Sequence, residues 1–409
     1  MIAMKIFYGW VIVGVGILVS CVGMGTLMSL GVFLQPISLD MGWSRTGIAV
    51  TSMIGFLAMG FGSFFWGALS DRFGARLVVL LGGVLLGIGL FAASHATRLL
   101  EFQFVFGVSV GLAAGSFYVP LTAMTVRWFT HNRSLAVALV SVGLGLGTTT
   151  MAPLSRWIML HHDWRFTLQV LSVIAWAVIL PASLLLREPS QLPRSASLVP
   201  QDVGKVPDIS LARALKTPQF FAIALAFFAC CAAHSGPIFH MVPNAVDCGV
   251  PDMTAATILS VAGLSGLVGR IVCGLLADRV GAKRTLVVGL MLQAAAISLY
   301  LFTRSLGEFY AVAVAFGFSY GGVMPLYAIL VRENFPIKIM GSVFGVVAMV
   351  STLGMAIGPW AGGWLFDTVG GYTWMYIASV GLGLSGMAIA MTVRPMRSGL
   401  SVRASPSPA

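Results

Sequence analysis

The sequence predicts an all-α membrane protein in which twelve transmembrane helices form two six-helix bundles. Composition is the first reason: 58% of the 409 residues are apolar and only 9% are charged, against about 25% charged residues in a soluble domain. Apolar runs of about 20 residues, long enough to cross a bilayer, also recur along the chain. Finally, the two halves of the chain repeat the same short motifs. A soluble enzyme, a disordered chain and a disulfide scaffold are therefore excluded.

The first six apolar runs are separated by short loops. The first run, at residues 8–34, is too long for the apolar segment of a cleaved signal peptide, so we expect it to remain as a span. Together the six runs make the first predicted bundle, at residues 1–187. They predict helices near residues 8–34, 47–70, 77–97, 101–127, 134–160 and 165–187.

Composition changes after the sixth helix. Residues 188–217 carry Pro189, Pro193, Pro200 and Pro207 with several basic residues, which predicts a cytoplasmic linker. A second bundle is expected at residues 218–396, and a disordered cytoplasmic tail at residues 397–409. The apolar runs of the second bundle predict helices near residues 218–247, 253–277, 285–303, 307–331, 339–366 and 374–393.

The net charge of +11 indicates membrane topology. Of the 24 lysine and arginine residues, eighteen lie near the termini or in one set of alternate loops, five lie in the other set, and Arg270 lies inside an apolar run. Basic residues concentrate on the cytoplasmic side of a membrane protein, so we expect both termini in the cytoplasm. No nucleic-acid partner is implied. The five cysteines lack a metal-binding spacing, and we expect neither a metal nor a cofactor.

Two motifs recur at nearly one offset. Gly-x-x-x-Asp-Arg-x-Gly occurs around Asp71 and again, 207 residues later, around Asp278. A proline followed seven residues later by arginine occurs at Arg127 and again, 205 residues later, at Arg332. Two repeats of six spans share one orientation in the membrane, so an axis along the membrane normal should relate them. Substrate is then expected at the midplane between the halves.

The repeated motif, the twelve spans and the central linker resemble the major facilitator superfamily over nearly the whole chain. The resemblance implies a two-bundle transporter whose inner gate is closed by charged residues. The motif aspartate can cap a span end and pair with arginine; the alternative for each basic residue is topology anchoring alone. The candidate gating residues are Asp71, Arg72, Arg76, Asp278, Arg279 and Arg127.

A narrower resemblance is to the monocarboxylate transporter and oxalate–formate antiporter group. It rests on Tyr8-Gly9-Trp10, Gly42-Trp43-Ser44-Arg45, His240-Met-Val-Pro243, Gly269-Arg270 and Arg127-Trp128-Phe129. In that group an arginine of the eighth helix binds the substrate carboxylate, which implies this role for Arg270.

Arg270 is also the most informative residue on physical grounds. A charge inside a span costs about 2.5–3.5 kcal/mol, so it indicates function by default. Side chains lean toward the N-terminus of their helix, which directs Arg270 toward the bilayer centre. The planar guanidinium suits a carboxylate, whereas the thirteen acidic residues all lie in loops or at span ends. Snorkelling to the surface and a structural hydrogen bond to carbonyl groups are the alternatives.

The sequence departs from the group in ways that favour a monoanion. The animal carriers have a lysine in the first helix and an aspartate one turn before the arginine. Here the first helix has no lysine after Lys5, and Gly266 stands one turn before Arg270. The second cation of the oxalate–formate exchangers is also absent from residues 339–366. Dicarboxylates and proton coupling through a buried Asp–Arg pair are therefore disfavoured.

Other polar residues of the spans are further substrate-binding candidates. Tyr118 should lie at the depth of Arg270 in the opposite half. His234 and His240 lie near two prolines that can bend the seventh helix, and either histidine could carry a coupling proton. Ordinary packing within the bundles is the alternative for each residue. The substrate-binding candidates are Arg270, Tyr118, Tyr320, His234, His240 and Tyr327.

These observations predict a multi-pass secondary transporter of the plasma or inner membrane. It would move a small organic monoanion, of the lactate or pyruvate type, by alternating access. Proton symport is the first expectation, and anion exchange or polyspecific drug export are alternatives, as is a transporter-like sensor. An uncharged polar substrate follows if Arg270 is structural. The expected partners are the anion, protons and the lipid bilayer. We expect a monomer and not an enzyme.

Overall fold

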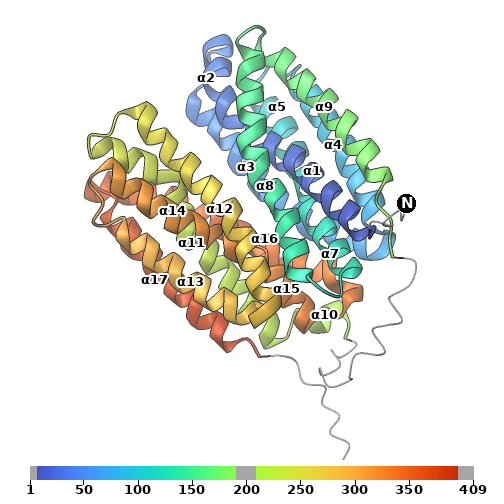
Figure 1. Cartoon of the computed structure of the whole chain (residues 1–409). Helices are drawn as coiled ribbons and strands as arrows, with labels where there is room; N and C mark the ends of the chain where they lie inside the picture. Colours follow the sequence, from blue (N-terminus) through green and yellow to red (C-terminus); the bar gives the residue numbers. More distant parts are fainter. Residues whose placement is uncertain (1–6, 190–208, 395–409) are drawn as a thin grey trace, which may run out of the picture.

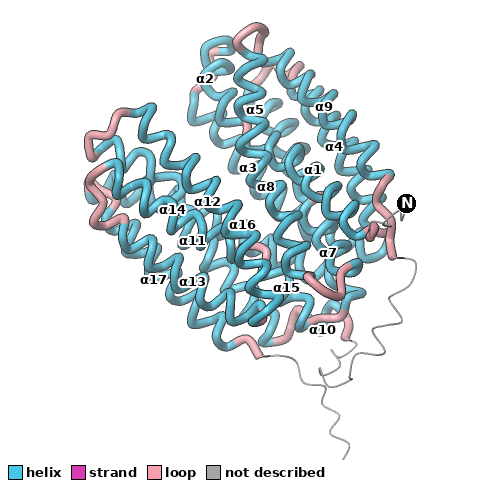
Figure 2. Tube along the Cα trace, in the orientation of Figure 1, coloured by secondary structure: helices cyan, strands magenta, loops and turns pink. Residues whose placement is uncertain are grey.

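The computed structural model describes residues 7–189 and 209–394 and is built from helices (Figures 1 and 2). Twelve helices among these residues are long enough and apolar enough to cross a membrane, and the described ranges contain no strand. The predicted fold class is confirmed. Part of the predicted linker, residues 190–208, and the predicted tail, residues 397–409, lie outside the described residues. The domain boundaries therefore stay predictions.

The first half of the chain supplies six spans. The first span is interrupted once, where α1 (Gly9–Met28) continues as α2 (Leu30–Met41). The next two spans are the single helices α3 (Arg45–Phe73) and α4 (Ala75–Ala93). The fourth span is assembled from α5 (Leu99–Phe102), the π-helical η1 (Gln103–Val110), α6 (Gly111–Gly115) and α7 (Tyr118–Trp128). The last two are α8 (Arg133–Met159) and α9 (Trp164–Leu184).

The second half follows the short helix α10 (Leu211–Ala214). Its first three spans are α11 (Pro218–Asp247), α12 (Asp252–Val280) and α13 (Ala282–Leu299). The next span consists of α14 (Leu306–Val323) and α15 (Leu326–Asn334). After the 3₁₀ turn η3 (Ile337–Ile339), α16 (Met340–Val369) and α17 (Thr373–Thr392) complete the fold.

Local sequence explains where several helices begin and end. The side chain of Ser44 accepts a hydrogen bond from the backbone of Gly47 and caps α3. The motif glycines Gly74 and Gly281 have φ of +86° and +94°, a conformation that glycine adopts without steric cost. Each separates two consecutive spans, so the repeated motif contains the tight turn of each half.

The two helices that carry the repeated motif extend three residues beyond their predicted ends. The ranges 47–70 and 253–277 were expected, whereas α3 ends at Phe73 and α12 at Val280. Asp71 and Asp278 therefore belong to the last turns of these helices instead of the loops. Because these side chains are polar, the apolar pattern ended before them and predicted shorter helices. In the fold both carboxylates hydrogen-bond to another helix.

The two halves share an apolar core at one end only. We call this the linker end, because α9 ends there and α11 begins there (Figure 1). Val119, Ala123 and Val137 of the first half belong to the same buried cluster as Phe344 and Val347 of α16. The other two clusters each draw their buried residues from a single half. The halves are thus packed together at the linker end and diverge toward the opposite end (Figures 1 and 2).

Candidate functional site

Arg270 lies at the middle depth of α12. Ten residues separate it from Val280 at the linker end, or about 15 Å of helix. The residue is only 7% exposed, and its Nε atom is buried without a hydrogen-bond partner among the described residues. The neighbouring Gly269 faces α14, where an added methyl group would contact the carbonyl oxygen of Phe318. Close packing of α12 on α14 at this glycine turns Arg270 toward a different side of the helix.

That side is the interface between the halves. A methyl group on Gly145 of α8 would lie 2.9 Å from Nη1 of Arg270. The Arg270 guanidinium, which belongs to the second half, therefore lies against α8 of the first half. Arg270 also acts electrostatically on Tyr118 in α7 and on His234 in α11. Residues of α7 and α8 in the first half and of α11 in the second half therefore lie near Arg270.

Tyr118 occupies the matching depth in the first half. Ten residues separate it from Trp128 at the linker end of α7, again about 15 Å. Its ring contacts Phe344 of α16 edge to face, with 6.0 Å between the ring centroids. Its hydroxyl is buried beside the Thr122 hydroxyl and interacts with it, but within the described residues neither forms a hydrogen bond of good geometry. Unsatisfied buried polar groups are uncommon and call for an explanation.

His234 and Tyr320 lie together in the second half. His234 is 2% exposed, and its ring stacks on Tyr320 with 5.2 Å between centroids. Its Nδ1 atom is 3.9 Å from Sγ of Cys230, which in turn donates to Oε1 of Gln293. This side chain therefore lies in a packed polar cluster near Arg270.

The other two predicted binding residues make different contacts. Tyr327 is fully buried, stacks on Phe227 and donates its hydroxyl to the carbonyl of Ala226. His240 lies six residues beyond His234, toward the opposite end, with 5.1 Å between its ring centroid and that of Tyr372. The structure thus brings Arg270, Tyr118, His234 and Tyr320 together, places Tyr327 against Cys230 of the His234 cluster, and leaves His240 outside this group.

Acidic side chains stay away from the centre throughout the described part of the chain. Asp163 and Glu308 cap helix N-termini, and Asp40 accepts from the indole of Trp164. Arg270 consequently has no ion pair among the residues that the structure describes. The acidic residues of the described ranges all lie near helix ends: Asp40, Asp71, Glu101, Asp163, Glu188, Asp247, Asp252, Asp278, Glu308, Glu333 and Asp367.

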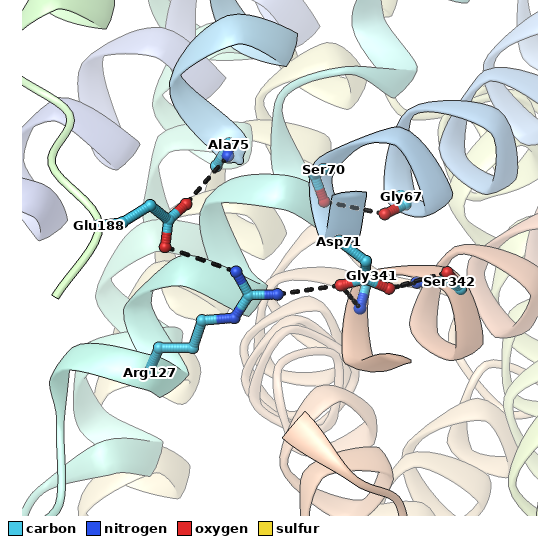
Figure 3. A network of polar contacts seen from close by, with 8 residues as sticks. All are labelled: Gly67, Ser70, Asp71, Ala75, Arg127, Glu188, Gly341 and Ser342. Carbon is cyan, nitrogen blue, oxygen red and sulfur yellow. Dashed lines mark hydrogen bonds and ion pairs between the residues drawn. The ribbon is translucent and has the colours of Figure 1, made fainter. Parts of the chain in front are cut away.

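Asp71 joins the two halves at the linker end (Figure 3). Its carboxylate accepts hydrogen bonds from the backbone N–H groups of Gly341 and Ser342, at 2.9 and 2.6 Å, and from the Ser342 hydroxyl. It therefore caps the N-terminus of α16 in the other half, where a negative charge is stabilised. Arg127 donates to the same carboxylate at 2.9 Å.

Glu188 extends this network within the first half (Figure 3). One carboxylate oxygen pairs with Arg127 at 3.4 Å, and the other accepts from the backbone N–H of Ala75 at the start of α4. Sequence reasoning did not assign Glu188 a role, because a single acid after a span carries no pattern. Because residue 75 is alanine, its contact with Glu188 is made by the backbone N–H group.

Asp278 makes the equivalent contact of the second repeat. Its two oxygens accept from the backbone N–H groups of Ser134 and Leu135, at 2.9 and 3.0 Å, and so cap the N-terminus of α8. The repeated aspartates thus each bind the opposite half. Asp278 is exposed, and in the described residues it forms no ion pair like that between Asp71 and Arg127.

The remaining gating candidates contribute differently. Arg72, Arg76 and Arg279 have exposed side chains. Arg72 lies over the adjacent Phe73 ring. Among described residues, none of the three forms an ion pair across the halves. The contacts at the linker end therefore centre on Asp71, Arg127 and Asp278.

Comparison with known proteins agrees with this architecture. A family model described as "Major Facilitator Superfamily" matches residues 15–279 and 247–409. The chain belongs to this superfamily. It is accordingly a multi-pass transporter of the cell membrane and not an enzyme. The superfamily's solved structures include the proton:xylose symporter XylE, which matches 95% of this chain and 97% of its own with a TM-score of 0.78 at 14% identity.

Two curated relatives place this superfamily member near carriers of monocarboxylates. Monocarboxylate transporter 13 of Bos taurus is 29% identical over 94% of this chain and 89% of its own length. Monocarboxylate transporter 11 of Homo sapiens is 29% identical over 93% of this chain and 82% of its own. The narrower resemblance drawn from short motifs thus extends along almost the entire chain.

Some residues of the candidate site could not be identified from the sequence. Gly145, Phe344 and Gln293 are common residue types in spans, and only the packing of the helices brings them beside Arg270, Tyr118 and His234. Gly145 alone left a signal, as the middle member of Gly143-x-Gly145-x-Gly147.

Proposed function

We propose that this transporter carries a small organic monoanion, a monocarboxylate, and that Arg270 binds its carboxylate. One observation carries the proposal: Arg270 is a buried cation at the interface of the halves without an acidic partner among the described residues. A buried charge is costly unless paired, and a substrate anion would supply the missing partner.

Tyr118 would act on the same anion from the first half. Its hydroxyl lies beside the Thr122 hydroxyl and makes no hydrogen bond of good geometry in the described chain, so it can donate to a carboxylate or hydroxyl oxygen of the substrate. Tyr320 and Phe344 present ring surface near Arg270 and Tyr118, which suits an apolar substrate tail. An anion held by Arg270 and Tyr118 would contact both halves, as alternating access requires.

The charge balance also favours this class over cationic drugs. A drug cation would need a buried acid, and the described acidic residues lie near helix ends. The printed names of the bovine and human relatives, both monocarboxylate transporters, support the same class.

We further infer proton symport, with His234 as the proton-binding residue. A protonated His234 and Arg270 would repel each other, and an anion bound to Arg270 would reduce that repulsion. Proton and anion would then bind together. The other titratable side chains around His234 are Cys230 and Cys231 of α11, Tyr320 of α14 and Tyr327 of α15. The charge bias of the loops supports a cytoplasmic location for the linker end and the termini. We also propose a monomer as the transporting unit.

Uptake into proteoliposomes tests the proposal. Vesicles containing the purified protein are given radiolabelled lactate or pyruvate outside, with and without an inward proton gradient. Symport predicts accumulation into vesicles that lack internal substrate, driven by the gradient and lost in Arg270→Gln. Accumulation only with preloaded substrate would establish exchange instead. Absence of monocarboxylate uptake under every condition would contradict the proposed substrate class.

A further inference from the structure

Three glycines at alternate positions on α8 face two different neighbours. Gly143 and Gly147 lie four residues apart, on one face of the helix. Methyl groups on them would contact the carbonyl oxygens of Ile17 and Cys21 in α1, so both allow close packing within the first half. Gly145 is two residues from each, about 200° around the helix. It therefore faces the other way.

Gly145 faces α12 of the second half. A methyl group there would lie 2.6 Å from Cδ2 of Leu267 and 2.9 Å from Nη1 of Arg270. Both distances are shorter than ordinary van der Waals contact. The backbones do not meet at this position, whereas at Gly143 the methyl group would contact backbone atoms of α1. Close packing of helices thus explains Gly143 and Gly147 but does not explain Gly145.

We propose that Gly145 is a positioning residue, which leaves room for the Arg270 guanidinium to lie across the interface and face Tyr118. The proposal rests on the proposed function, since it concerns the anion bound by Arg270. A side chain at position 145 would displace the end of Arg270 toward its own half. The anion would then lose the simultaneous contact with Arg270 and Tyr118 and bind more weakly.

Gly145→Ala tests this role, and two further variants separate it from a packing defect. Leu267 would also be displaced, so Gly145→Ala/Leu267→Ala removes that contact and keeps the one with Arg270. Gly263→Ala on α12 is the matched control, because a methyl group at Gly263 would meet no atom within 4 Å. The purified proteins are compared by lactate binding, lactate uptake in proteoliposomes and melting temperature, with Arg270→Gln alongside.

The expected result is a dissociation constant and KM raised about tenfold in Gly145→Ala, with the maximal uptake rate and melting temperature near those of the wild type. The double variant should bind as weakly as Gly145→Ala, and Gly263→Ala should match the wild type. Wild-type affinity in Gly145→Ala, or its recovery on adding Leu267→Ala, would overturn the positioning role and leave the proposed function intact. Failure of the wild type to bind lactate, or wild-type binding by Arg270→Gln, would overturn both.

Discussion

Arg270 and Tyr118 carry buried polar groups, and each residue contacts the opposite half of the molecule. Their equal depth could be predicted from the sequence, because each follows the start of its span by a similar number of residues. The contact of Arg270 with Gly145 and that of Tyr118 with Phe344 could not, since neither partner differs from the many small and apolar residues of the spans. The two candidate residues could thus be identified from the sequence, whereas the residues that contact them could be identified only from the fold.

Tyr118→Phe should weaken anion binding without unfolding the protein. The variant removes a hydroxyl that lies beside Thr122 and forms no hydrogen bond of good geometry within the described residues. A hydrogen bond to a charged group contributes about 1.5–3 kcal/mol, so the dissociation constant for lactate should rise at least tenfold by isothermal titration. Tyr327→Phe is the matched control: its hydroxyl donates to Ala226, so the melting temperature should fall while lactate affinity holds. The reverse pattern would remove Tyr118 from the site.

His234→Gln should abolish the pH dependence of anion binding. In the wild type we expect tighter lactate binding as the pH falls from 8 to 5.5, because proton and anion bind together. The glutamine variant should bind equally at both pH values. His161→Gln, which changes an exposed histidine near the opposite end of α8, serves as the control. Unchanged pH dependence in His234→Gln would assign the proton to another group.

At the scale of the helices, the sequence predicted twelve spans and missed their interruptions. The break between α1 and α2 at Ser29, the π-helical η1 and the break between α14 and α15 all fall inside continuous apolar runs. Hydropathy is insensitive to such changes of backbone geometry. The repeated aspartates illustrate a related limit: the motif predicted a helix cap, but the capped helices belong to the opposite half.

Asp71→Asn should weaken closure at the linker end. The change removes the ion pair with Arg127 and the charge that stabilises the N-terminus of α16. A loss of about 1–2 kcal/mol would shift the conformational equilibrium about 5- to 30-fold. Spin labels on residues 76 and 284, exposed near the starts of α4 and α13, would report longer distances.

Two comparisons make this prediction specific. Arg72→Gln changes the adjacent exposed charge and should leave the distance distribution unchanged. Asp278→Asn should have a smaller effect than Asp71→Asn, because Asp278 is exposed and caps α8 without an ion pair. Equal shifts in all three variants would indicate a general effect of charge instead of specific capping.

At the scale of the whole molecule, the two halves share a core only at the linker end. The proposed anion site lies at the boundary of this shared region, where Arg270 and Tyr118 meet the opposite half. The repeat in the sequence predicted two equivalent halves. The repeat could not predict whether the halves pack together at the linker end or at the opposite end, because the same helices can form both arrangements.

Substrate should therefore draw the halves together at the end opposite the linker. Spin labels on residues 160 and 302, which are 67% and 75% exposed in loops of opposite halves, would measure this motion in a cysteine-free background. Saturating lactate should shorten the distance in the wild type and leave Arg270→Gln unchanged. An identical distance distribution with and without lactate in the wild type would argue against substrate-driven closure.

The most direct test of the central claim is the melting temperature of the purified wild type and Arg270→Gln with a panel of ligands. The panel holds lactate and pyruvate, the dicarboxylate succinate, and the uncharged sugar glucose. A ligand at 100 times its dissociation constant stabilises the folded protein by about 2.7 kcal/mol, which a melting curve resolves. We predict stabilisation of the wild type by the monocarboxylates alone, and none of Arg270→Gln. Stabilisation by glucose but by no acid, or equal stabilisation of both proteins by lactate, would contradict the assignment of Arg270 as the anion site.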